Sequence, residues 1–88
     1  MEELLKQIGI DDEPTEITEN KLIIDIPDSD TFGKYYSKLE KTDVVKPDLD
    51  SSQLSPFASS LQYINDDVTI TLTSDFQADT YKLVIREN

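Results

Sequence analysis

The stretch VTITLTSDFQADTYKLVIRE, residues 68–87, decides the fold that this sequence predicts. Its first part, residues 68–74, alternates strictly between branched apolar side chains and threonines, and residues 80–87 repeat the alternation. A period of two is typical of an antiparallel strand with one buried face and one face in water. The intervening DFQAD has the length of a hairpin connection, so we expect two adjacent antiparallel strands.

The segment before this hairpin, residues 56–65, has two interpretations. Pro56 can begin a helix whose apolar side chains are Phe57, Leu61 and Ile64. Alternatively, residues 60–65 form a strand that turns into the next one through an Asn-Asp-Asp sequence. We favour the strand, because a lone hairpin is only marginally stable and a third strand completes a β-meander.

Towards the N-terminus, KLIIDI at residues 21–26 predicts a further strand, which Pro27 ends. Residues 29–42 predict a helix whose apolar face is formed by Phe32, Tyr36 and Leu39. Residues 2–8 predict a short helix that stops at a glycine and needs a surface to pack against.

These elements together predict a single small acidic domain, residues 1–88. The fold class we expect is α+β with two layers. One main helix (about 29–42) packs on an antiparallel sheet of three to four strands (about 21–26, 60–65, 68–74 and 80–87), and the short helix at residues 2–8 docks beside it.

The stretch IPDSDTFGKYYSKLE, residues 26–40, has acidic residues at spacings found in a calcium-binding loop. Asp28, Asp30 and Gly33 fit loop positions one, three and six of an EF-hand. Phe32 and Leu39, however, stand where the fifth and twelfth positions need oxygen ligands. We therefore expect no metal site here, and instead a helix capped at its N-terminus by Asp28 or the serine after it.

The composition argues against catalysis. The chain has no cysteine and no histidine, which removes thiolate ligands, the usual zinc sites and the common nucleophile–base pairs. Its two glycines cannot build a glycine-rich phosphate loop. The paired aspartates Asp11-Asp12, Asp48/Asp50 and Asp66-Asp67 all fall in predicted loops, where aspartate serves local hydrogen bonds. We expect no enzyme activity, no catalytic or cofactor-binding residues and no cofactor.

The net charge of −11 favours solubility and opposes direct binding to nucleic acid or to anionic membranes. No apolar run has the length of a membrane span, and the N-terminus lacks the features of a signal peptide. We therefore expect a soluble, cytoplasmic protein.

The charge is distributed unevenly along the chain. Residues 1–31 hold ten acidic and two basic residues, whereas residues 34–46 hold four of the eight basic residues. The predicted partner-binding residues are the acidic ones of this first third: Asp11, Asp12, Glu13, Glu16, Glu19, Asp28 and Asp30. A secondary basic patch is expected on the main helix, formed by Lys34, Lys38 and Lys41.

Three functions are compatible with these features. The first is a non-enzymatic acidic interaction module that binds a protein partner with a basic surface. The second is a DNA-mimic inhibitor of a nucleic-acid-binding protein, of the type that phages and mobile elements encode. The third is a small structural or assembly component of a larger particle, for which self-association is an expected property.

Overall fold

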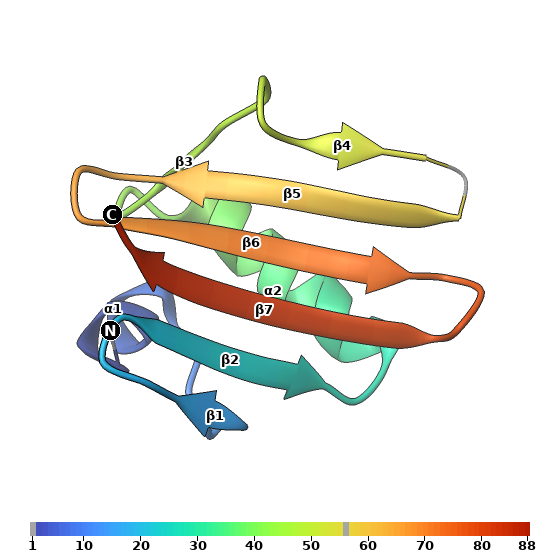
Figure 1. Cartoon of the computed structure of the whole chain (residues 1–88), viewed down its shortest axis with the longest axis horizontal. Coiled ribbons are helices and arrows are strands. Elements are labelled where there is room, and N and C mark those ends of the chain that lie inside the picture. Colours follow the sequence, from blue (N-terminus) through green and yellow to red (C-terminus); the bar gives the residue numbers. More distant parts are fainter. Residues whose placement is uncertain (1, 56) are drawn as a thin grey trace.

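The computed structural model describes residues 2–55 and 57–88. Its elements follow one another as α1 (Glu2–Ile8), β1 (Glu16–Ile17), β2 (Lys21–Ile26), α2 (Ser29–Lys41), β3 (Lys46–Pro47), β4 (Gln53–Leu54), β5 (Ala58–Ile64), β6 (Val68–Asp75) and β7 (Thr80–Glu87). The strands form one antiparallel sheet in the order β1-β2-β7-β6-β5-β3, and β4 pairs with the opposite end of β5 (Figure 1).

The predicted fold class is wrong. The protein is mostly sheet, with 41% strand against 23% helix, and its sheet has seven strands where one main helix on three to four strands was expected. The difference comes from β1, β3 and β4, which are two residues long each. Two residues cannot show a periodicity, and these strands exist because longer neighbours offer them a pairing edge.

The long strands carry the core. β6 and β7 pair along their whole length, from Val68 opposite Glu87 to Asp75 opposite Thr80. Along β6 the side chains alternate between buried and partly exposed, as the alternation of its sequence requires. The segment that could be helix or strand is the strand β5, which pairs with β6; residue 56 lies outside the described part of the chain.

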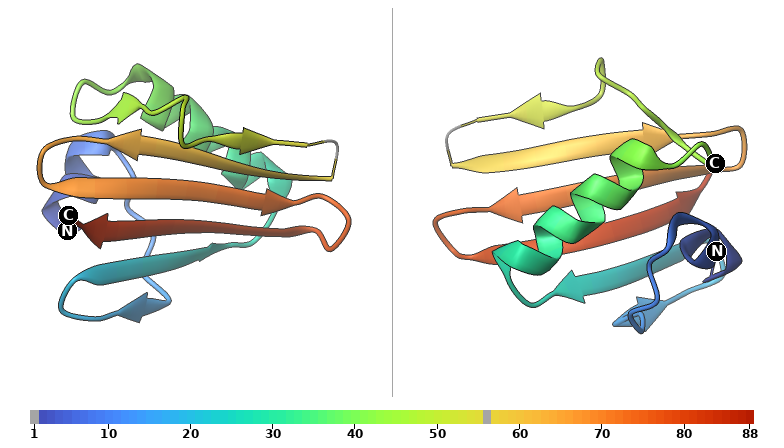
Figure 2. Two further views of the ribbon diagram at one scale, coloured as in Figure 1. Left: turned by 45° about the horizontal axis from the view of Figure 1, so that its top comes forward. Right: turned by 180° about the vertical axis from the view of Figure 1, so that it is seen from behind.

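Both helices lie on the same face of the sheet, with α2 running diagonally across it (Figure 2). α2 begins at Asp28, whose side chain accepts a hydrogen bond from the Thr31 N–H at 2.8 Å. Its buried residues are Tyr35 and Leu39, whereas Tyr36 is 42% exposed. The predicted apolar face was therefore wrong at Tyr36: Phe32, Tyr35 and Leu39, at i, i+3 and i+7, share the face that packs on the core.

In the part of the chain that the structure describes, the other face of the sheet has no helix over it (Figures 1 and 2). The strand register places Thr71, Val84 and Ile23 side by side on this face. All three are only partly buried, in contrast to Leu72 and Leu83 on the helix-covered face, which are fully buried. Within residues 2–55 and 57–88, neither helix is long and apolar enough to cross a membrane.

Candidate functional site

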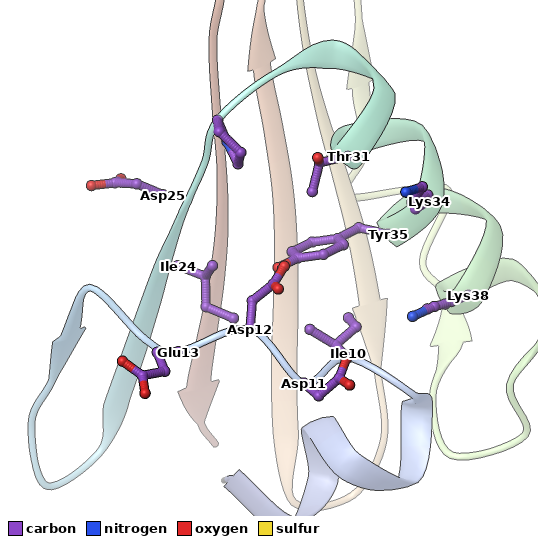
Figure 3. A pocket seen from close by; sticks show the side chains of 11 residues that line it. Ile10, Asp11, Asp12, Glu13, Ile24, Asp25, Thr31, Lys34, Tyr35 and Lys38 are labelled. Atoms are coloured by element: carbon purple, nitrogen blue, oxygen red, sulfur yellow. The ribbon is translucent and has the colours of Figure 1, made fainter.

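A cavity of about 360 Å³ opens between the loop after α1, strand β2 and helix α2 (Figure 3). It brings residues 10–13 of the acidic first third next to the lysines of α2. The residues that line it are Ile10, Asp11, Asp12, Glu13, Ile24, Asp25, Pro27, Thr31, Lys34, Tyr35 and Lys38. It is the place in the described structure where the predicted acidic and basic residues meet.

The end of α1 fixes where the following loop starts. We call residues 10–15, which include Asp11, Asp12 and Glu13, the acidic loop. Gly9 has a φ of +97°, a left-handed conformation that glycine adopts without strain. Its N–H donates to the Lys6 carbonyl at 3.1 Å, and the Ile10 N–H donates to the Leu5 carbonyl at 2.8 Å. This pair of bonds is the Schellman motif, and the buried Ile10 then anchors the chain before the exposed carboxylates begin.

Two side chains of α2 form hydrogen bonds with the segment from Gly9 to Asp12. The Tyr35 hydroxyl donates a hydrogen bond to the Asp12 carboxylate, and the Lys38 ammonium donates to the Gly9 carbonyl. Burial of Tyr35, together with its bond to Asp12, raises the pKa of its hydroxyl above the ordinary value of 10.0. The hydroxyl therefore remains a protonated donor at neutral pH.

The carboxylates around the cavity differ in direction. Asp12 points at Tyr35, whereas the carboxylates of Glu13 and Asp25 point away from the centre of the cavity (Figure 3). Asp11, Asp12 and Glu13 are all exposed, so their charges face solvent or a bound partner. The four carboxylates outnumber the two lysines of the lining, which makes this region attractive to a cationic group.

The geometry offers no metal centre among residues 2–55 and 57–88: no three potential ligands converge as metal binding needs. The cavity is also wide and lined by both charges, with the inward-facing Asp12 and Lys38 already bonded within the chain. The inward-facing charged groups of the lining are therefore engaged within the chain, whereas Asp11 and Glu13 remain exposed.

The remaining predicted partner-binding residues lie outside the cavity. Glu16 belongs to β1, and Glu19 follows it in the turn to β2. Asp28 caps α2, and Asp30 lies in the first turn of that helix. Hydrogen bonding of the Asp28 carboxylate with Thr31 lowers the pKa of Asp28 below its usual value. All four are exposed.

The structure divides the predicted basic patch. Lys34 and Lys38 line the cavity, whereas Lys41 in the last turn of α2 does not. Sequence reasoning missed Tyr35 and Asp25 as parts of this site. Asp25 interrupts an apolar strand, which was the available signal; Tyr35 could not be separated from Tyr36 by helical spacing alone.

Comparison with protein-family models, with curated proteins and with solved structures gave no match. The function is therefore argued from the residues of this chain.

Proposed function

We propose that this chain is a non-enzymatic acidic interaction module that binds a protein partner with a basic surface. The observation that carries the proposal is the position of the charge. β1, which contains Glu16, lies at one edge of the seven-stranded sheet, and we call residues 11–19 the acidic edge. All seven predicted acidic residues are exposed, so their carboxylates are accessible to a partner.

The rigidity of the acidic loop supports the same proposal. Asp12 and Gly9 are tied to α2, and the Asp25 N–H donates to the Thr15 hydroxyl at 2.9 Å on the other side of the loop. A loop held at both ends presents its carboxylates in a fixed arrangement. Preorganised charges lose less entropy on binding, so they contribute affinity and orientation as well as a faster encounter.

The test uses two variants of equal net charge. The first, Asp11→Asn/Glu13→Gln/Glu16→Gln, removes three exposed charges from the acidic edge and leaves the Asp12–Tyr35 bond in place. The control, Asp43→Asn/Asp66→Asn/Asp67→Asn, removes three exposed charges from other loops. Each immobilised protein captures partners from a lysate at low and at high salt, because contacts between exposed charges weaken with ionic strength.

We expect wild type and the control to capture the same basic protein at low salt, and the acidic-edge variant to lose it. Equal capture by both variants would contradict the proposal, since it would mean that net charge alone is recognised. Adding duplex DNA as a competitor addresses the alternative proposal of DNA mimicry. A mimic shares its binding site with the duplex, so DNA would displace the captured protein.

A further inference from the structure

Part of the sheet edge opposite the acidic loop, formed by β4 and β5, carries no charged side chain, whereas β3 at the same edge contains Lys46; we call the β4–β5 part the neutral edge. Residues 51–65 contain no acidic or basic residue, although 31% of the chain is charged. This segment forms β4 and β5, which lie at the far end of the strand order from β1 and β2 (Figure 1). The chain is therefore polarised across the sheet, from a carboxylate-rich edge to a neutral one.

Large apolar side chains are exposed at the neutral edge and at the turn after β6, which follows Asp75. Leu54, Phe57 and Phe76 are 77%, 58% and 49% exposed, and we call these three residues the apolar edge patch. Phe57 and Phe76 are adjacent, because the Phe76 N–H donates to the Phe57 carbonyl at 2.8 Å. The Phe76 ring also meets Tyr81, with centroids 6.4 Å apart, so the patch continues into the core.

The backbone of β4 is open to a further strand. The Ser55 N–H donates to the Ala58 carbonyl at 2.9 Å, and antiparallel pairs alternate, so the N–H and carbonyl of Leu54 point away from β5. On the same side of the sheet, β3 consists of a lysine and a proline, which discourage strand addition. β4 has neither, and its side chains are glutamine and leucine.

We propose that the apolar edge patch is a self-association surface, at which β4 pairs antiparallel with β4 of a second copy in a two-fold dimer. A two-fold axis lets one patch meet an identical patch and satisfies the outward N–H and carbonyl of Leu54 in both copies.

The lack of charge at this edge favours a second copy of the chain as its partner. Two chains of net charge −11 repel one another, and the neutral edge is where they can approach with the fewest like charges in contact. In the dimer the two acidic edges lie on opposite outer sides. Each is separated from the interface by five strand spacings of about 4.8 Å, or more than twice the Debye length of about 10 Å at 0.1 M salt.

The exposed area sets the strength of this dimer. About half of each phenylalanine is accessible, which is roughly 100 Å² per ring, whereas a standard interface buries about 800 Å² per partner. The dimer is therefore a weak one that forms at high protein concentration. Added salt strengthens it, because salt screens the repulsion between the two acidic chains.

Sedimentation equilibrium of the full chain, from about 10 to about 500 µM and in about 0.1 and 0.5 M NaCl, tests the proposal. We expect a monomer–dimer equilibrium that shifts towards dimer at the higher salt. Leu54→Lys and, separately, Phe76→Lys should raise the dissociation constant at least about tenfold. Ile17→Lys is the matched control, because Ile17 is an apolar residue of the opposite edge strand and is 53% exposed.

Circular dichroism establishes that each variant is folded, and Phe76 lies outside the backbone of β4, so it tests the patch without altering that strand. All three substitutions reduce the net negative charge equally, so relief of repulsion cannot explain a difference among them. A chain that stays monomeric over the whole range would overturn the proposal. A dimer weakened as much by Ile17→Lys as by Leu54→Lys would overturn it too.

Discussion

The bond between Tyr35 and Asp12 is the contact whose removal is most informative, because it fixes the acidic loop to α2. Tyr35 is 3% exposed, whereas Asp12 lies at the surface. Replacing Tyr35 by phenylalanine keeps the buried ring and removes only the donor. The carboxylate that loses this donor can still be hydrated, so we expect a cost at the lower end of the range for charge-assisted bonds, about 1.5 kcal/mol.

The substitution of the other partner, Asp12→Ala, destabilises the protein for a different reason. It leaves the buried Tyr35 hydroxyl without its acceptor, which costs about 1–3 kcal/mol. Once Asp12 is absent, Tyr35→Phe removes a group that no longer has its partner, so the second substitution becomes nearly neutral. The two changes are therefore coupled, by about 1–2 kcal/mol.

Urea denaturation of the wild type, both single variants and the double variant, followed by circular dichroism, gives this coupling free energy. For a domain of 88 residues, each 1 kcal/mol also corresponds to a shift of about 4–8 °C in Tm, which provides a second readout. Single effects that add within about 0.5 kcal/mol would show that other contacts, and not the Tyr35–Asp12 bond, hold the loop.

Three further predictions concern the fold. Gly33→Ala should stabilise the protein by up to about 1 kcal/mol, since nothing lies within 4 Å of the added methyl group. Gly9→Ala should destabilise the protein, because the φ of Gly9 is +97°. Urea denaturation that ranks the two variants in the opposite order would contradict both predictions. Leu72→Ala should cost about 2–5 kcal/mol in the same assay, because the side chain is fully buried, and a cost below about 1 kcal/mol would place it outside the core. Burial raises the pKa of both Tyr35 and Tyr63, so their contribution to stability is complete below about pH 10 and is lost as the pH rises above it. A Tyr35→Phe/Tyr63→Phe protein should therefore lose less of its free energy of unfolding at alkaline pH than the wild type. An equal loss in both proteins would contradict this cause.

The long elements could be predicted from the sequence because each repeats its periodicity several times. At alternate residues β6 has four buried positions and β7 has three, and β2 occupies the range 21–26 that its apolar residues indicated. The number of strands could not be predicted in the same way. β1, β3 and β4 depend on hydrogen bonds to an existing edge, and sequences such as Lys46-Pro47 have little strand preference of their own.

The candidate site was predictable only in its parts. The sequence shows an excess of acidic residues in residues 1–31 and a set of lysines in α2. It predicts them as two separate surfaces. Their meeting at one cavity follows from the course of the loop after Gly9 and from the diagonal placement of α2. Both are results of tertiary packing, for which a single sequence contains no local signal.

We propose that a basic partner binds at the acidic edge of the sheet. Titration of the isotope-labelled full chain with an oligolysine peptide of about ten residues, followed by amide chemical shifts, locates the binding surface. Binding at this edge predicts saturable, salt-sensitive shifts concentrated in residues 11–19 and 25–30. Shifts spread equally over the distant carboxylates of Asp66, Asp67, Asp75 and Asp79, or the absence of shifts at residues 11–19, would contradict it.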